Sequence, residues 1–197
     1  MSRDIVIDHI HKSFGGRIVL RDVCLRFPAG RVSCLMAASG AGKTTLLRLM
    51  MGLETPDGGA IHGLEGARIA PVFQENRLLM PLDAVGNIQL VAPGLSRAEI
   101  LEALSAIGLG NSALQPVSEL SGGMKRRVAL LRALLSDGDV LLMDEPFNGL
   151  DEATRQGVVI ETLRRIRGRT TVIVTHDPEE AALTGGEIHT LEPHSGQ

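Results

Sequence analysis

The chain has 197 residues, 44% of them hydrophobic and 22% charged, a composition typical of one globular domain with a sizeable core. Its net charge of -3 provides no strong positive field, which argues against nucleic acid as a partner. No apolar run approaches the roughly 18 residues that span a bilayer, and the N-terminus lacks the apolar stretch of a signal peptide. We therefore expect a cytoplasmic protein. The two cysteines, Cys24 and Cys34, lie in apolar runs without metal-ligand spacing, so we interpret both as small core residues in a reducing compartment.

The first segments alternate apolar and polar residues. DIVIDHI and RIVLRDVCLRF have the pattern of strands with one buried face, and Gly15-Gly16 is the expected turn between them. VSCLMA is continuously apolar and predicts a strand buried on both faces. After a loop of small residues, KTTLLRLMMG predicts a helix that ends at Gly52. Two short strands are expected at about 60–64 and 68–73.

The middle of the chain, residues 76–135, has a mostly helical pattern. Ser96 and Glu99 have the spacing of a capping box at the start of RAEILEALSAIG, and a further helix is expected from about Gly122 to Leu135. The strand DVLLMDEP, a helix over about 154–166 and the strand TTVIVTHD follow.

Strands separated by helical segments predict an α/β fold with a parallel core. The opening hairpins add an N-terminal antiparallel β lobe, at about 1–30 and 57–70, and residues 76–135 form a helical lobe.

The segment AASGAGKTT has the pattern of a phosphate-binding loop between a strand and a helix, with Ala37 where the first glycine of G-x-x-x-x-G-K-[ST] belongs. Lys43 would neutralise phosphate charge, and the Thr44 hydroxyl would bind Mg²⁺. The alternative is a turn of small residues before a helix. If position 37 requires a left-handed backbone, alanine costs roughly 1–2 kcal/mol there.

Two acidic residues, Asp144 and Glu145, end a buried strand, where ligands bind in open α/β sheets. Asp144 would hold Mg²⁺ through water, and Glu145 would accept the proton of an attacking water. A solvated acidic turn is the alternative, and it is disfavoured downstream of a phosphate loop.

The segment LSGGMKRRVALLRALL predicts a helix whose first turn holds cations, where the helix dipole disfavours them. Ser121, Gly122 and Gly123 leave its N-terminus open as an anion site. We expect Arg126 and Arg127 to belong to a solvated face.

These motifs together resemble the ATP-binding cassette (ABC) ATPases over nearly the whole chain. AASGAGKTT resembles the Walker A loop, and LSGGM resembles the signature motif, with Met124 in place of the usual glutamine. Gln74 in VFQENRLL resembles the Q-loop glutamine, VLLMDEPFNGLD resembles Walker B and the D-loop, and VTHD contains a match to the switch histidine, His176.

The resemblance implies a P-loop NTPase (RecA-like) fold, with residues 1–197 as a single ABC ATPase domain, and ATP and Mg²⁺ as cofactors. It assigns catalysis to Glu145, His176 and Gln74, and Mg²⁺ to Thr44, Gln74 and Asp144. His176 would contact the γ-phosphate or the attacking water. It assigns the nucleotide to a larger set: Phe14 against adenine, Ser39, Gly40, Ala41, Gly42, Lys43, Thr44, Thr45, Ser121, Gly122, Gly123 and Asp151.

The family works as a head-to-tail dimer of two cassettes, in which Lys43 of one copy and Ser121 of the other hold the same ATP. The expected partners are therefore a second copy or a related cassette and a transmembrane permease, with a substrate-binding protein as a further component. FQENRLL and LSGGM resemble importers of the nitrate, sulfonate and taurine group. This resemblance places the protein on the inner face of the cell membrane as the ATP-hydrolysing subunit of an importer.

Two other functions stay open: a non-transport ATPase of the same family, and a nucleotide-gated dimerisation switch with weak turnover. Ala37 and Asn148-Gly149 in the D-loop keep the second open. The sequence ends at Gln197, soon after His176, so we expect no C-terminal regulatory domain. A segment of apolar residues lies beside Gln74 in the sequence. It could receive a permease helix or form part of the core of the helical lobe, and both interpretations stay open. Its apolar residues are Leu78, Leu79, Met80 and Leu82.

Overall fold

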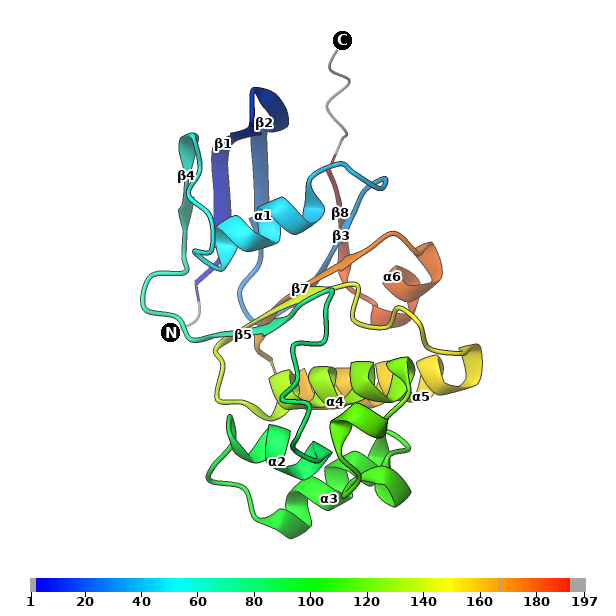
Figure 1. The fold of residues 1–197 in the computed structure, drawn as a ribbon. Coiled ribbons are helices and arrows are strands. Elements are labelled where there is room, and N and C mark those ends of the chain that lie inside the picture. Colours follow the sequence, from blue (N-terminus) through cyan, green and yellow to red (C-terminus); the bar gives the residue numbers. More distant parts are fainter. Residues whose placement is uncertain (1–2, 167, 192–197) are drawn as a thin grey trace. The chain divides into compact units, whose positions relative to one another are not determined.

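The computed structural model describes residues 3–166 and 168–191, and the chain divides into two compact units (Figure 1). Within the described residues the first unit comprises 3–71, 139–145 and 168–191. The second comprises 72–138 and 146–166. Among these residues no helix combines the length and the apolar composition needed to cross a membrane.

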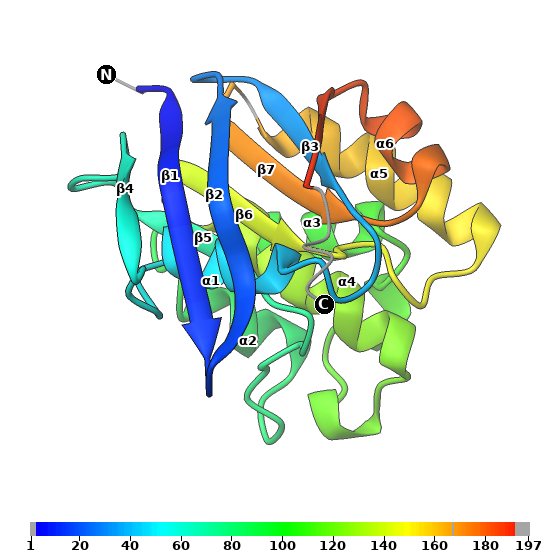
Figure 2. The same ribbon diagram turned by 90° about the horizontal axis from the view of Figure 1, so that it is seen from above.

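The first unit begins with a three-stranded antiparallel sheet, ordered β2-β1-β4 (Figure 2). The strands are β1 (Ile5–Phe14), β2 (Arg17–Phe27) and β4 (Gly58–His62). Gly15 and Gly16 make the turn between β1 and β2, both with positive φ. The alternating pattern of the sequence is confirmed, because the apolar positions on one face are buried.

The second sheet of this unit is five-stranded, in the order β5-β6-β7-β3-β8. Its strands are β3 (Val32–Met36), β5 (Ile69–Val72), β6 (Val140–Asp144), β7 (Thr170–Thr175) and β8 (Glu187–Thr190). The pairs β3–β7, β6–β7 and β3–β8 are parallel. All residues of β6 and β7 are buried, including the threonines of β7, as expected for parallel strands covered on both faces. The predicted parallel α/β core is therefore confirmed.

Helix α1 (Lys43–Met50) contributes Leu46, Leu47, Leu49 and Met50 to one hydrophobic core, which also contains residues of β1, β2, β3, β6 and β7. The predicted end at Gly52 is confirmed. Gly52 has φ 67, its N–H donates to Leu49 O at 3.0 Å, and Leu53 N donates to Arg48 O at 2.9 Å. This pair of bonds closes the last turn of the helix.

The sequence analysis missed the last helix and strand of this unit, α6 (Pro178–Thr184) and β8. Asp177 caps α6 by accepting from Glu179 N at 2.8 Å, and Pro178 is at its first position. This cap and proline are a sequence signal for a helix start that the analysis did not use.

The second unit contains four α-helices among its described residues: α2 (Ala84–Gln89), α3 (Arg97–Ala106), α4 (Gly122–Leu135) and α5 (Glu152–Ile166). Two short 3-10 helices, η1 (Gly110–Ser112) and η2 (Val117–Glu119), connect α3 to α4. The capping box of α3 is confirmed: Ser96 Oγ accepts from Glu99 N at 3.3 Å, and the Glu99 carboxylate accepts from Ser96 N at 2.8 Å.

Arg126 is buried, so the prediction that it belongs to a solvated face is wrong. Its guanidinium donates to the carbonyl oxygens of Phe73, Gln74 at 3.3 Å and Pro146 at 3.1 Å. The reason is helical phase, since Arg126 shares its face of α4 with buried Leu130. Arg127, predicted in the same way, is only partly exposed, and it donates to Ile107 O at 2.7 Å.

The prediction for the cysteines is confirmed for Cys34, which is buried in β3, and wrong for Cys24, which is exposed on β2. Successive side chains of a strand point to opposite faces. Val23 and Leu25 pack against the core, so Cys24 between them faces solvent.

Arg126 generates a stability prediction. Arg126→Met removes the donor from several backbone carbonyls, and we expect the free energy of unfolding to fall by about 2–3 kcal/mol. Arg48→Met is the matched control, because Arg48 is an exposed helix residue whose ion pair with Glu54 lies at the surface. It should change stability by less than about 0.5 kcal/mol. Urea unfolding of both variants measures the difference, and equal midpoints would show that the Arg126 bonds add no stability.

Candidate nucleotide-binding site

The loop between β3 and α1 is closed around the side chain of Lys43. This lysine is buried, and its Nζ donates to the carbonyl oxygens of Ala37 at 2.6 Å and Ala38 at 2.9 Å. The ammonium is therefore held inside the loop by backbone acceptors. Ala37 at the start of the loop supplies one of these acceptors through its main chain, which any residue could supply.

Two glycines of this loop, Gly40 with φ 80 and Gly42 with φ 92, have left-handed backbones. A Cβ at Gly42 would lie 2.6 Å from Leu20 Cδ2, so this position excludes side chains for steric reasons as well. Gly42 is also the N-cap residue of α1 and has no side chain that could bond the first N–H groups of the helix. The unbonded N–H groups at the N-terminus of α1 can therefore bind an anion.

Ala37 has no left-handed backbone. The non-glycine residues with positive φ in the described part of the chain are His9, Asp22, Arg77 and Glu145. The cost of roughly 1–2 kcal/mol that a left-handed alanine would carry therefore does not arise at position 37. Replacement of the first glycine leaves the loop entry unstrained.

Thr44, the second residue of α1, contacts the end of β6. Its Oγ1 donates to Asp144 Oδ2 at 2.8 Å, and Asp144 is the last residue of the strand and is buried. The structure thus brings together the two oxygens that the sequence analysis assigned to one ion. A hydroxyl and a carboxylate are the hard oxygen ligands that Mg²⁺ prefers, so the donor set fits this ion.

Glu145 and His176 form a second polar pair at the ends of β6 and β7. His176 Nδ1 donates to Glu145 Oε1 at 2.9 Å. The Glu145 side chain is 17% exposed and that of His176 is 62% exposed, so the carboxylate is partly shielded and the ring is open to solvent. Glu145 has φ 46, and its N–H donates to Val174 O at 2.9 Å. This rare backbone conformation turns the carboxylate away from the strand direction.

The turn that carries His176 is held by three residues that the sequence analysis did not single out. Thr175 Oγ1 donates to buried Glu180 Oε2 at 2.6 Å and accepts from Asp177 N at 3.0 Å. These bonds fix the backbone on both sides of His176. Only the contact across the turn reveals this role, because a glutamate within a helix has no distinctive pattern in sequence.

The remaining predicted nucleotide residues of the first unit differ in exposure. Phe14 is exposed at the end of β1, with Lys12 Nζ 4.9 Å from the centre of its ring. Ser39 and Gly40 are exposed, whereas the Ala41 side chain is buried, so Ala41 can offer a ligand only its backbone.

Five other predicted site residues belong to the second unit: Gln74, Ser121, Gly122, Gly123 and Asp151. Gln74 is exposed in the segment after β5. Ser121 is the N-cap of α4, and its Oγ accepts from Met124 N at 3.3 Å, which leaves the hydroxyl hydrogen free to donate. Its neighbours Gly122 and Gly123 begin the helix.

Asp151, in the same unit, caps α5. Its Oδ1 accepts from Thr154 N at 3.0 Å, and this bond lowers the pKa of Asp151 below its usual value. Asp151 thus has a structural role at the start of α5, in addition to the role in nucleotide binding that the resemblance implies.

Comparison with known proteins identifies the family. Residues 20–148, more than half of the chain, match the family model described as ABC transporter. The aliphatic sulfonates import ATP-binding protein SsuB of Pseudomonas fluorescens (strain Pf0-1) is 40% identical over 196 residues, which cover 95% of this chain and 73% of that protein. The SsuB protein of Pseudomonas entomophila (strain L48) is 40% identical over 198 residues, with the same coverage of both chains.

Two solved structures have the same fold. The dimeric structure of MJ0796, described as a bacterial ABC transporter cassette, superimposes with a TM-score of 0.83 at 28% identity, over 96% of this chain and 94% of that one. A post-hydrolysis state of MJ0796 bound to ADP and Pi also has a TM-score of 0.83, at 27% identity over 98% and 97% of the two chains. The predicted P-loop NTPase fold is confirmed, and the chain belongs to the ABC transporter family as its ATPase domain.

Proposed function

We propose that this chain is the ATP-hydrolysing subunit of an ABC importer, and that residues 1–197 form a single cassette. The observation that carries the proposal is the contact of Thr44 Oγ1 with Asp144 Oδ2 at 2.8 Å, directly after the buried Lys43. It combines a phosphate-binding lysine with two oxygen ligands for Mg²⁺. Direction of transport is inferred from the relatives, which are described as import proteins.

ATP is the substrate of this site. The phosphates bind to the loop amides, the N-terminus of α1 and the ammonium of Lys43, which the carbonyls of Ala37 and Ala38 hold in position. Phe14 stacks on the adenine through its exposed ring. The phosphate-binding residues are Ser39, Gly40, Ala41, Gly42, Lys43, Thr44 and Thr45.

Mg²⁺, when bound, would neutralise charge on the phosphate oxygens and on the leaving group. Thr44 and Asp144 would hold it, and the family resemblance assigns Gln74 as a further oxygen ligand.

Hydrolysis depends on Glu145 as the general base for the attacking water. The bond from His176 Nδ1 to Glu145 Oε1 orients the carboxylate that would accept the proton of the water. His176 is thereby placed to orient the base and to donate to the γ-phosphate or the water through its other nitrogen.

Transport requires two cassettes and a membrane partner. Two copies would bind ATP between them, with a nucleotide held by Lys43 of one copy and by residues of the other, namely Ser121, Gly122, Gly123 and Asp151. Loss of the γ-phosphate on hydrolysis would remove much of the attraction across the dimer and reopen it. A related cassette could take the place of the second copy.

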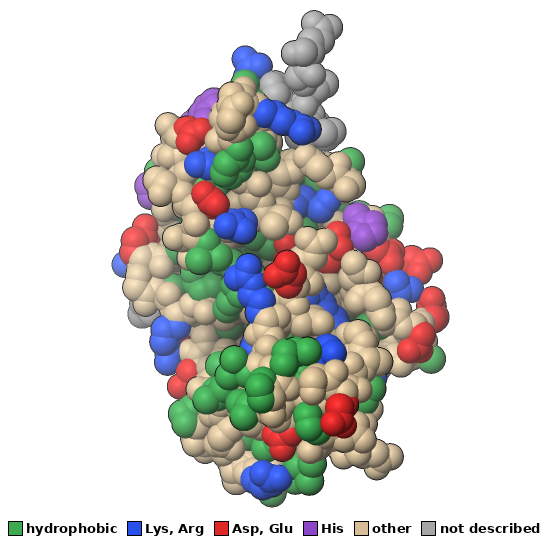
Figure 3. All heavy atoms as spheres, viewed as in Figure 1, with side chains coloured by type: hydrophobic (Ala, Val, Ile, Leu, Met, Phe, Trp, Pro, Cys, Tyr) green, Lys and Arg blue, Asp and Glu red, His purple; other side chains and the backbone are tan. Residues whose placement is uncertain are grey.

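The partner in the membrane would be a permease, supplied with its cargo by a substrate-binding protein, and the cassette would lie on the cytoplasmic face of the membrane. Leu79, Met80 and Leu82 are 51%, 43% and 37% exposed, which favours docking over a core role for these three, whereas Leu78 is half-buried. Figure 3 is drawn in the view of Figure 1, and its hydrophobic side chains gather in the region where Figure 1 draws α2. An exposed apolar group of this kind suits a helix of another protein.

The first prediction from this proposal concerns the phosphate-binding loop. Ala37→Gly should change the dissociation constant for MgATP by less than about twofold, because position 37 contributes an unstrained carbonyl. Lys43→Ala should weaken binding by at least about tenfold, because it leaves phosphate charge uncompensated. Isothermal titration calorimetry measures both, and the chain contains no Trp or Tyr for a fluorescence readout. Tighter binding by Ala37→Gly, tenfold or more, would contradict the unstrained loop.

The second prediction concerns dimerisation. Glu145→Gln keeps the size of the side chain but cannot accept a proton at ordinary pH, so turnover should fall by at least about a hundredfold and an ATP-bound dimer should accumulate. Ser121→Arg in the same background should abolish this dimer by filling the shared site, while ATP binding to the monomer persists. Light scattering with and without MgATP decides between these states. A monomer at saturating ATP for Glu145→Gln, with its permease bound, would contradict the shared site.

The third prediction concerns the permease. Leu79→Asp places a charge in the exposed apolar group and should prevent co-purification with the co-expressed permease while ATP affinity is retained. Ile160→Asp is the matched control, because Ile160 is a 69% exposed apolar residue on α5 outside this group. Co-purification of the permease with Leu79→Asp at the level of the control would show that it docks elsewhere.

A further inference from the structure

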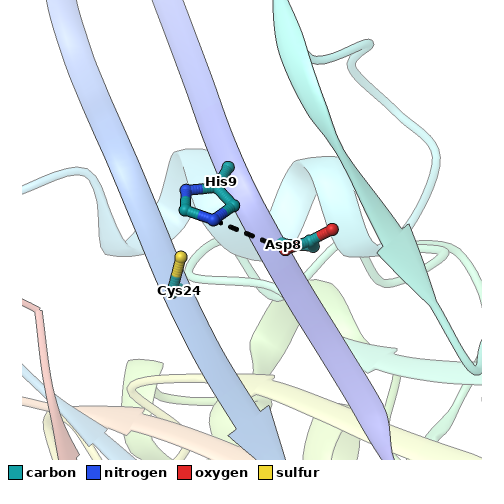
Figure 4. A group of neighbouring side chains, drawn as sticks. All are labelled: Asp8, His9 and Cys24. Atoms are coloured by element: carbon teal, nitrogen blue, oxygen red, sulfur yellow. Dashed lines mark ion pairs between the residues drawn. The ribbon is translucent and has the colours of Figure 1, made fainter.

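A group of side chains of metal-ligating types lies on the exposed face of the antiparallel sheet, and none of them is assigned to catalysis or nucleotide binding. It comprises Asp8, His9 and His11 of β1 and Asp22 and Cys24 of β2. All five side chains are exposed. Figure 4 shows His9 and Cys24 side by side on neighbouring strands, with Asp8 next to His9. Their nitrogen, oxygen and sulfur atoms form a mixed ligand set.

Two irregularities in the pairing of β1 with β2 bring these side chains together. Ile7 pairs with Leu25 and Ile10 with Val23, so that Asp8 and His9 both oppose the single residue Cys24. This is a β-bulge, and it places two consecutive side chains of β1 on the exposed face. A regular strand would direct one of them into the core.

The second irregularity is on the partner strand. Ile10 pairs with Val23 and Lys12 with Leu20, so that Arg21 and Asp22 both oppose His11. The bulged residues His9 and Asp22 have left-handed backbones, with φ 49 and φ 53, and their side chains bond to each other. The backbone thus turns both residues toward the same place on the face.

Three ligand types meet within a short distance. One ligand atom each of Asp8, His9 and Cys24 lies within 4.8 Å of the others. The Asp8 Oδ1 to His9 Nε2 distance is 3.9 Å. Small side-chain rotations would bring three such atoms to the bonding distances of one ion, about 2.0–2.3 Å for zinc.

Asp22 orients the imidazole. His9 Nδ1 donates to Asp22 Oδ1 at 2.6 Å, so in the neutral ring the proton resides on Nδ1 and Nε2, 3.9 Å from Asp8 Oδ1, carries the lone pair that a metal would bind. A carboxylate bonded to the far nitrogen of a histidine is the common outer support of a metal ligand. His11 Nε2 is 3.8 Å from the same Asp22 oxygen, so a second imidazole lies beside the orienting carboxylate.

We propose that Asp8, His9 and Cys24 bind a divalent transition-metal ion, Zn²⁺ in the first place, with Asp22 as the orienting residue and His11 or water as the fourth ligand. The thiolate and imidazole select a borderline ion over Mg²⁺ and Ca²⁺, which prefer oxygen alone. The site is thereby chemically distinct from the pair formed by Thr44 and Asp144. Bound metal would join β1 to β2 across both bulges and stabilise the sheet that carries Phe14.

The test uses the full chain, free of nucleotide and Mg²⁺ and kept reduced, titrated with Zn²⁺ and with Co²⁺ as a spectroscopic substitute. We expect one equivalent of Co²⁺ to produce a thiolate-to-cobalt charge-transfer absorption and Zn²⁺ to displace it. The band identifies Cys24, because Cys34 is buried beside Thr184 at 3.0 Å and cannot reach solvent. An ion bound at Thr44 and Asp144 has only oxygen ligands and gives no such band.

Variants assign the ligands. Cys24→Ser should remove the band, and both Cys24→Ser and His9→Asn should weaken Zn²⁺ binding at least about tenfold. Asp22→Asn should weaken it by about 10–100-fold while the band persists, as expected for an orienting residue. His62→Asn is the matched control, since His62 is an exposed histidine of β4 outside the group, and should bind as the wild type does.

Thermal unfolding supplies a readout that is independent of colour. Zn²⁺ should raise the unfolding temperature of the wild type and of His62→Asn, and should leave that of Cys24→Ser unchanged. Cys24→Ser alters one exposed atom, so it folds whether or not the site exists. A missing charge-transfer band in the wild type, or equal Zn²⁺ affinity of wild type and Cys24→Ser, would overturn the proposal.

Discussion

The parallel register of β3, β7 and β6 is the constraint on which the candidate site depends. Met36 of β3 pairs with Thr175 of β7, and Asp144 of β6 pairs with Val174. The next residue after each strand therefore leaves the sheet at the same edge. The phosphate loop, Glu145 and His176 begin there because parallel strands present their carboxyl ends together. A shift of one residue in β6 would turn Asp144 to the other face and separate it from Thr44.

Burial of charge near this edge explains which loop residues can vary. A buried ammonium requires acceptors, and Lys43 obtains them from the carbonyls of Ala37 and Ala38. Because these acceptors belong to the main chain, alanine supplies them at position 37 as glycine would, and its methyl group packs against the hydrophobic core. Gly42 differs, since a Cβ there would meet Leu20. The two positions look alike in the glycine pattern of the loop, but of the two only Gly42 has the left-handed backbone that favours glycine.

The first unit uses backbone irregularity at two separate places. Glu145 has a positive φ that directs its carboxylate toward His176, and His9 and Asp22 have positive φ in opposed bulges of the antiparallel sheet. In each case the unusual backbone brings polar groups together that a regular strand would keep apart. The hydrophobic core of the unit stabilises the neighbouring segments and maintains these conformations.

The sequence by itself determined the features that rest on local patterns: strands β3, β6 and β7 of the parallel core, α4 and its limits, the capping box of α3 and the end of α1 at Gly52. It also identified the phosphate-binding loop, the acidic pair Asp144 and Glu145, and His176, because each lies at the end of a strand in a recognisable motif. Only the tertiary structure decided that Arg126 is buried, that Cys24 is exposed and that His176 bonds to Glu145. These outcomes depend on helical phase, strand register and contacts between segments distant along the chain, and no local pattern encodes which partner a side chain will meet.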